Sequence, residues 1–205
     1  MSIEVWLAYL ATAVVFSLAP GSGTVNSISN GMVYGWRKSL ASILGLQAGL
    51  AFHLLLVGVG LGAIVAKSAT AFTLIKWVGV IYLVWLGIQK WRETTTLDVA
   101  ASSVQVPAWQ LFRQAVMVNL TNPKTIVFLV ALFPQFLNPA EPQLLQLTVL
   151  GITTLAIDTI VMLFYVTLAS KLTMYIRSAR VMGGLNRMFG SMFIGCGALL
   201  ATART

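Results

Sequence analysis

The sequence predicts an all-α integral membrane protein with six transmembrane helices. Of its 205 residues, 58% are hydrophobic and only 9% are charged, whereas about 25% of the residues of an average soluble domain are charged. Six apolar stretches have lengths that suit tilted membrane helices of about 20 residues. They cover residues 5–18, 40–66, 72–88, 115–137, 144–169 and 182–203.

These stretches leave no room for a second domain. Six crossings of about 20 residues take up about 120 residues, and connections and termini account for the remainder. We therefore expect a single transmembrane domain over residues 1–205, with no separate catalytic or ligand-binding domain. The longest polar connection separates a first half of three spans, residues 1–93, from a second half, residues 113–205, and leaves residues 94–112 as a cytoplasmic connection.

Weak internal symmetry relates the two halves. The first span of each half is interrupted at a proline, Pro20 or Pro123, and the second span of each carries one titratable residue, His53 or Asp158. Because each half has an odd number of spans, such a repeat would be inverted. We expect two inverted three-helix repeats with broken first and fourth helices; chance similarity between apolar segments is the alternative.

The charges indicate how the chain lies in the membrane. Thirteen Lys and Arg residues against five acidic residues give a net charge of +8. The cations lie between apolar stretches and form no aromatic-basic stripe, so we expect membrane orientation rather than nucleic-acid binding. Cations favour the cytoplasmic side, which predicts that both termini are periplasmic. The cytoplasmic connections would hold Arg37, Lys38, Lys90, Arg92, Arg113, Lys171, Arg177, Arg180 and Arg187, and the opposite side Lys67, Lys76 and Arg204.

Several classes of site are excluded by counting. Cys196 is the single cysteine and His53 the single histidine, so the chain has neither a cysteine pair for thiol-redox chemistry nor a set of histidines for a metal centre. We expect no metal and no cofactor. The first apolar stretch follows Glu4 and no basic residue, so we interpret it as a retained span and not as a secretion signal.

The two proline breaks are the first candidate site. A proline inside a span removes a backbone donor and frees a carbonyl group, and such polar groups persist where they line a cavity. A helix that restarts after the first break would offer N–H groups to a carboxylate. The alternative is that the first helix simply ends near the surface and that the lysine extends outward to the headgroups. The predicted substrate-binding residues are Pro20, Gly21, Ser22 and Gly23 in the first break, and Asn119, Asn122, Pro123 and Lys124 in the second.

Asp158 is the most informative single residue. A carboxylate inside a span costs about 2.5 to 3.5 kcal/mol on insertion scales, so it requires a partner or a cavity. Helical spacing places Gly151, Thr154, Asp158 and Tyr165 on one face, which we expect to point inward, with Tyr165 near the substrate. A buried carboxylate can exchange a proton, so Asp158 is our candidate for proton coupling; a neutral Asp that only links helices is the alternative.

Three further features are less specific. His53 matches Asp158 in the first half and is a second candidate for proton coupling, although a lone histidine below Gly45 and Gly49 can also be a packing residue. Gln47 faces elsewhere on that helix and is a candidate for substrate contact. Small residues of the third and sixth spans would be helix-packing points or an oligomer interface; they are Gly79, Gly87, Gly190, Gly195 and Gly197.

Several motifs together resemble the LysE/RhtB family of amino-acid exporters. They are PGSG at Pro20–Gly23, GLQAGLAFH at Gly45–His53, KWVGVIYLVWLGIQKW at Lys76–Trp91, NLTNPKTIVFL at Asn119–Leu129, FPQF at Phe133–Phe136, and Asp158. The resemblance covers nearly the whole chain, with one departure, since many relatives have PGP where this chain has Pro20-Gly21-Ser22. It implies a bacterial inner-membrane transporter, not an enzyme, which exports homoserine, homoserine lactone and threonine-like amino acids and uses the proton gradient.

The implied substrates suggest a mechanism. Homoserine has a carboxylate and its lactone does not, but both carry an α-ammonium group when protonated. We therefore expect Asp158 to bind the ammonium group, carbonyls freed at Pro20 and Pro123 to assist, and the amides of Asn119 and Asn122 to recognise the oxygen. Competition between proton and ammonium for one carboxylate would produce antiport. The alternatives are an exporter of another amino acid or of a cation, a structural subunit, and an intramembrane serine protease built on Ser22 and His53.

Overall fold

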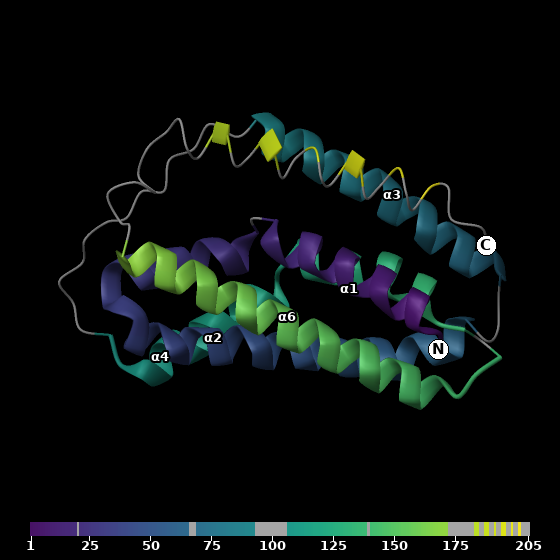
Figure 1. Ribbon diagram of the computed structural model, residues 1–205, viewed down its shortest axis with the longest axis horizontal. Coiled ribbons are helices and arrows are strands. Elements are labelled where there is room, and N and C mark those ends of the chain that lie inside the picture. The colour runs from purple at the N-terminus through teal and green to yellow at the C-terminus, as the bar shows by residue number, and fades with distance from the viewer. Residues whose placement is uncertain are drawn as a thin grey trace.

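The computed structural model of the protein describes residues 1–19, 21–65, 69–92, 106–138 and 140–171, with single positions between 183 and 201. All regular structure in these residues is helical (Figure 1). The elements are α1 (Ile3–Leu18), α2 (Ser22–Val65), α3 (Ala69–Arg92), α4 (Ala108–Leu120), α5 (Pro123–Val127), the π-helix η1 (Phe128–Leu132), the 3-10 helix η2 (Phe133–Phe136) and α6 (Gln143–Lys171). The stretch expected at residues 182–203 falls largely outside the described residues, so the count of six spans and the inverted repeat stay predictions.

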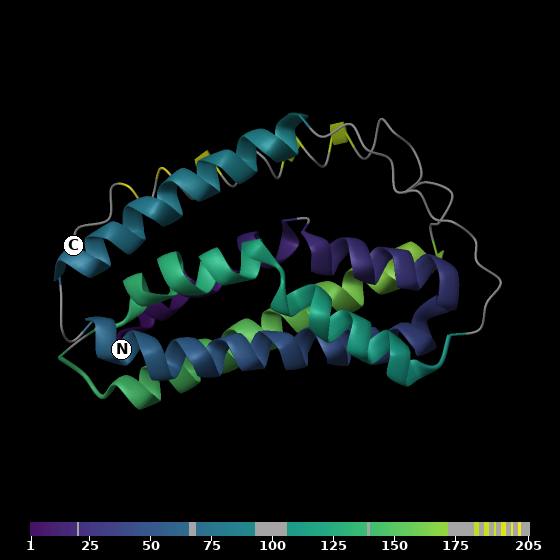
Figure 2. The ribbon, with the colours of Figure 1, turned by 180° about the vertical axis from the view of Figure 1, so that it is seen from behind.

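Helix α2 consists of two helices joined at Gly35. This residue has φ +73° and ψ 177°, a backbone conformation that glycine adopts without a steric penalty. The chain reverses here (Figures 1 and 2), and side chains join the two arms on either side of the turn. The Ser42 hydroxyl donates to Asn26 Oδ1 at 2.6 Å, and Asn30 Nδ2 donates to the Ser42 hydroxyl at 2.9 Å.

Both predicted helix breaks are present. Helix α1 ends at Leu18 and α2 begins at Ser22, so a new helix starts two residues after the first proline. Between α4 and the helices that follow it, the axis bends by 50°. Asn122 begins the second helix as an N-cap, because its Oδ1 accepts a hydrogen bond from the Lys124 N–H at 3.1 Å, and the proline at the first helical position needs no donor.

Glycines bring α2 close to α4, as the sequence indicated for Gly45 and Gly49. A Cβ atom at Gly45 would lie 2.2 Å from the Phe112 carbonyl oxygen, and one at Gly49 would lie 2.9 Å from Asn119 Cβ. No side chain fits at either position without a shift of backbone. The first arm of α2 contacts α6 in the same way, since a Cβ at Gly31 would lie 3.0 Å from the Val166 carbonyl oxygen. Helix packing through small residues is typical of membrane helices.

The outer surface suits a bilayer. Among the described residues, two helical segments are long and apolar enough to cross a membrane, Ser22–Gly60 and Gln143–Lys171, and a third is obtained if the bent pair from α4 to η2 counts as one span. Large aliphatic side chains face outward on both segments, with Leu55 69% exposed and Val59 82% exposed on α2. A soluble protein rarely exposes such side chains in contiguous patches, whereas lipid accommodates them.

Helix α4 begins within the predicted connection. Residues 94–112 were expected to link the two halves, but α4 already begins at Ala108. Pro107 occupies the N-cap position with extended backbone angles, and Trp109 stacks on Phe112 with ring centroids 5.3 Å apart. The helix therefore starts ahead of the apolar stretch. Helix α3 extends past its predicted limits for the same reason, because hydropathy locates the part of a helix in lipid and not the helix ends.

The amino terminus is attached to the segment before α6. The Met1 ammonium group donates to the Glu141 carboxylate, and this hydrogen bond lowers the pKa of Glu141. Helix α1 packs along α6, and Tyr9 of α1 contacts Phe133 of η2 edge to face at a centroid distance of 5.8 Å. These contacts hold the amino-terminal half of α1 against η2 and the segment before α6.

Candidate functional site

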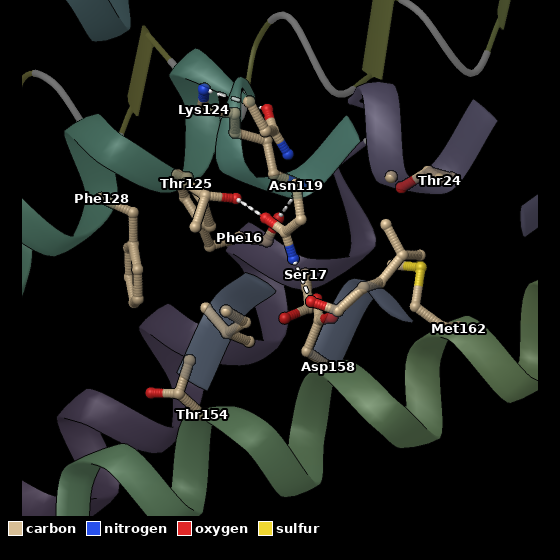
Figure 3. Close-up of a pocket in the computed structure, with 14 residues that line it drawn as sticks. Phe16, Ser17, Thr24, Asn119, Lys124, Thr125, Phe128, Thr154, Asp158 and Met162 are labelled. Carbon is tan, nitrogen blue, oxygen red and sulfur yellow. Dashed lines mark hydrogen bonds between the residues drawn. The ribbon is translucent and has the colours of Figure 1, made fainter. Parts of the chain in front are cut away.

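A cavity lies where the two helix breaks meet α6. It is small in this conformation, with about 30 Å³ open to the centre of a water molecule, which is room for about two waters. It must therefore widen to admit a molecule much larger than water. The lining residues come from α1, α2, α4, the second break, α5, η1 and α6 (Figure 3): Phe16, Ser17, Gly23, Thr24, Leu46, Leu50, Asn119, Asn122, Lys124, Thr125, Phe128, Thr154, Asp158 and Met162.

Lys124 joins the two breaks. Its side chain is only 8% exposed, and Nζ donates to the carbonyl oxygens of Phe16 at 2.8 Å and Ala19 at 2.7 Å. These carbonyls belong to the end of α1, where the helix dipole is negative and a cation is favoured. In a continuous helix the Phe16 carbonyl would need the N–H of residue 20, which proline lacks. Lys124 thus provides the missing donor and does not extend outward to the headgroups.

Gly21 makes room for this lysine. A Cβ atom at Gly21 would lie 3.1 Å from Lys124 Cδ, closer than nine in ten such contacts. The lysine ammonium also lies 4.9 Å from the centre of the Phe16 ring, within the range of a cation–π interaction. The glycine of the first break therefore serves the packing of the lysine from the second break.

Asn119 is the polar centre of the cavity wall. Its Nδ2 donates to the Leu46 carbonyl oxygen of α2 at 2.5 Å, and its Oδ1 accepts from the Thr125 hydroxyl at 3.1 Å. Since an amide has two donor hydrogens and two acceptor lone pairs, each end of Asn119 has capacity for one more hydrogen bond. The amide of Asn122 already caps α5 through its oxygen.

Asp158 reaches the cavity from α6. Its Oδ2 accepts a hydrogen bond from Gln47 Nε2 at 2.8 Å, so the glutamine lies behind the carboxylate and does not itself line the cavity. Figure 3 shows Asp158 and Lys124 on opposite sides of the set of lining side chains, with Asn119 between them. An anion and a cation in one cavity are complementary to a zwitterion.

Tyr165 acts at the first break and not in the cavity. Its hydroxyl donates to the Leu18 carbonyl oxygen at 2.6 Å, so it satisfies another carbonyl at the end of α1. One turn before Asp158, Thr154 bonds to the Tyr9 hydroxyl and donates to the Leu150 carbonyl oxygen at 2.8 Å. The predicted polar face of α6 therefore does point inward, toward both the cavity and α1.

The remaining candidates lie elsewhere. The Ser22 side chain is exposed and lies outside the cavity lining. His53 also lies outside it, and its Nδ1 is 3.1 Å from the Gly49 carbonyl oxygen of the same helix, which is the arrangement of a packing histidine. Pro20 falls outside the described residues, and Pro123 occupies the first position of α5. In the described part of the chain, no three His, Cys, Asp or Glu side chains cluster so as to hold a metal ion.

Several lining residues were not among the predicted candidates. Ser17 and Thr24 flank the first break, and Thr125 follows Lys124 in the second. Each lies within four residues of a proline that interrupts a span. That proximity was the available signal, because hydroxyl groups close to a helix break lie where the backbone itself borders a cavity.

Comparisons with known proteins identify the family of the chain. The sequence profile of the LysE type translocator family matches residues 14–204. A membrane protein of Vibrio cholerae is 63% identical over the full length of both chains. The homoserine/homoserine lactone efflux protein of Salmonella typhimurium is 48% identical over 100% of this chain and 99% of its own. The leucine efflux protein of Klebsiella pneumoniae is 29% identical over 98% and 96%.

No solved structure is significantly similar to the chain. The family match is nevertheless nearly complete, since it covers both breaks, the cavity and α6. Together with the apolar helices, it establishes that the chain belongs to the family of LysE-type membrane translocators.

Proposed function

We propose that the protein exports homoserine, homoserine lactone and threonine-like small amino acids across the bacterial inner membrane, in exchange for protons. The observation that carries the proposal is the position of Asp158, a carboxylate on a membrane helix that borders a cavity formed by two broken helices. A charged group at such a position is expected to have a function, because insertion in the membrane is costly. The cavity supplies the binding site that a transporter requires.

The polar lining supports small hydroxylated substrates. The Salmonella typhimurium relative is named for homoserine and homoserine lactone efflux, and a more distant one for leucine efflux. The hydroxyl groups of Thr24 and Thr125 and the amide of Asn119 border the cavity. Asn119 and Thr125 bond to each other, but Asn119 can make further hydrogen bonds and the Thr24 hydroxyl has no partner among the described residues. A leucine side chain would leave this capacity unused, which is unfavourable for buried polar atoms, whereas a hydroxyl or a lactone oxygen can bond to it.

Asp158 is our candidate for the coupling residue. The carboxylate can hold a proton or the ammonium group of the substrate, but binding of one opposes binding of the other. Gln47 would orient the carboxylate through its hydrogen bond to Oδ2. Since Lys124 already occupies the carbonyl oxygens of Phe16 and Ala19, the ammonium group has Asp158 as its partner in this conformation.

The test is transport by purified protein in liposomes with an imposed pH gradient, with homoserine, its lactone, threonine, leucine and lysine compared side by side. We expect Asp158→Asn to abolish transport driven by the gradient, because the amide can neither release a proton nor neutralise an ammonium group. Thr159→Val is the matched control, since Thr159 lies next to Asp158 and donates only to the Leu155 carbonyl oxygen at 2.7 Å.

Two results would contradict the proposal. Transport by Asp158→Asn at the wild-type rate would remove Asp158 from the mechanism. Transport of leucine or lysine in preference to homoserine and its lactone would remove the assigned substrate class. Equal amounts of monodisperse protein from both variants are required, so that a folding defect is not mistaken for lost coupling.

A further inference from the structure

Thr24 differs from the other threonines of the helices. Seven threonine hydroxyls in the described helices and at their ends donate to the carbonyl oxygen four residues earlier: those of Thr12, Thr121, Thr148, Thr153, Thr154, Thr159 and Thr167. The Thr24 hydroxyl oxygen has no hydrogen-bond partner among the described residues, although Thr24 is only 1% exposed. A buried hydroxyl without a partner is unfavourable, so its presence needs an explanation.

The position of Thr24 explains why its own helix leaves it unpaired. Thr24 is the third residue of α2, so no helical turn precedes it to supply a carbonyl oxygen. The residue lines the cavity, and Figure 3 shows its hydroxyl turned toward the other lining side chains. Gly23 lines the same cavity, and the first N–H groups of an α-helix have no acceptor within the helix. Side-chain and backbone donors are thus present together at one end of the cavity.

We propose that the Thr24 hydroxyl and the amino-terminal turn of α2 form the subsite for the carbonyl oxygen of the substrate. The proposal rests on the function proposed above and deepens it. Homoserine and its lactone share two groups, an ammonium group and a carbonyl oxygen attached to the adjacent carbon. If Asp158 binds the first and Thr24 donates to the second, the substrate lies between α6 and the start of α2.

A neutral donor suits a site for both compounds. A lysine or arginine at this position would favour the carboxylate of homoserine over the uncharged ester carbonyl of the lactone. A hydroxyl donates to either oxygen, and the partial positive charge of a helix amino terminus adds moderate attraction for the anion. Thr24 is therefore a specificity-determining residue that allows the site to bind both an acid and its lactone.

The test compares variants of the full-length protein by equilibrium binding in detergent or nanodiscs. Thr24→Val preserves the side-chain shape and removes the donor, and we expect it to weaken binding of homoserine lactone about 5- to 20-fold, the effect of losing one hydrogen bond. Thr24→Ser retains the hydroxyl and should bind nearly as the wild type does. As a matched ligand, 3-aminotetrahydrofuran has the ring and amine of the lactone but lacks its carbonyl oxygen. Its affinity should be the same for the wild type and Thr24→Val.

Thermal unfolding separates this role from a structural one. Thr24→Val removes a buried hydroxyl that has no partner in the described part of the chain, so its melting temperature without substrate should equal or exceed that of the wild type. Thr154→Val, which loses the hydrogen bonds to Tyr9 and Leu150, should melt lower.

Four outcomes would overturn the inference. Unchanged binding of the lactone by Thr24→Val would show that the hydroxyl is not used. An equal loss of affinity for the lactone and for 3-aminotetrahydrofuran, or a lowered melting temperature, would indicate that Thr24 shapes the protein and does not recognise the oxygen. Failure of the wild type to bind homoserine and its lactone would refute the proposed function as well. This result is seen in the wild type alone, whereas failure of the Thr24 subsite is seen only when Thr24→Val is compared with a wild type that binds.

Discussion

Lys124 has one role that only the structure could assign. A lysine near a proline break can line a cavity or extend to the headgroups, and both alternatives satisfy the same hydropathy pattern. Its buried ammonium group holds the carbonyls of Phe16 and Ala19, which are more than a hundred residues away along the chain. The missing hydrogen-bond donor could be predicted from the sequence, because Pro20 has no N–H for the Phe16 carbonyl. The sequence did not indicate which donor would compensate.

We predict that Lys124→Met destabilises the protein by about 1 to 3 kcal/mol, because buried carbonyl oxygens at the end of α1 lose their donor. Thermal unfolding in detergent measures the effect. Lys171→Met is the control, since Lys171 is exposed in the last turn of α6. A Lys124→Met variant that unfolds at the wild-type temperature would mean that the bridge between the breaks contributes nothing to stability.

Asn119 and Asp158 were easier to identify from the sequence, since a polar residue in an apolar stretch is conspicuous. Thr24 was not, because threonine is common in membrane helices and usually bonds to its own helix. Its lack of a partner depends on where α2 begins, and this boundary was not determined by hydropathy. Whether a hydroxyl is available to a substrate thus depends on its hydrogen-bond partners, and the sequence does not show which partners it has.

Helix α2 is the element that organises the packing. The α2–α4 and α2–α6 contacts are more extensive than those of any other pair of elements in the described chain. The predicted small-residue face at Gly45 and Gly49 is confirmed as the contact with α4. The turn at Gly35 was not predicted, although the cations at Arg37 and Lys38 had indicated a connection there. Glycine with positive φ lets the chain reverse without a loop, and hydropathy does not detect such a turn.

The α2–α4 contact leads to a sharp prediction for Gly45→Ala. The added Cβ would lie 2.2 Å from the Phe112 carbonyl oxygen, so the helices must separate, and overpacking of this kind costs about 1 to 3 kcal/mol or more. Gly60→Ala is the matched control on the same helix, because a Cβ atom at Gly60 would have no neighbouring atom within 4 Å. Thermal unfolding should distinguish the two variants, and equal melting temperatures would show that α4 does not pack against Gly45 as described.

For the whole molecule, orientation in the membrane remains a proposal from the distribution of cations. The structure supplies positions at which to test it. Ala140 is exposed in the segment before α6, next to the Glu141 that binds the amino terminus, and Trp36 is 44% exposed beside the Gly35 turn. We propose that the amino terminus is periplasmic and that the turn is cytoplasmic.

Single cysteines introduced into a Cys196→Ser background will decide this point. In intact spheroplasts, an impermeant maleimide should label Ala140→Cys, whereas Trp36→Cys should react only after the membrane is opened. Neither substitution alters a cation, so the determinants of orientation stay as they are. The reverse labelling pattern would place the amino terminus in the cytoplasm and refute the proposed topology.

The membrane class, the positions of two broken helices and the carboxylate that needs a cavity can be predicted from the residues alone, because each follows from local chemistry: apolar length, a proline without an N–H, and a charge in lipid. Packing between distant helices sets the rest: Lys124 closes α1, Gln47 supports Asp158, Thr24 lacks a partner among the described residues, and His53 bonds within its own helix. Periodicity assigns residues to the faces of one helix. Which faces meet depends on packing between helices distant in sequence, and that is set by the close approaches at glycines and the angles at the breaks.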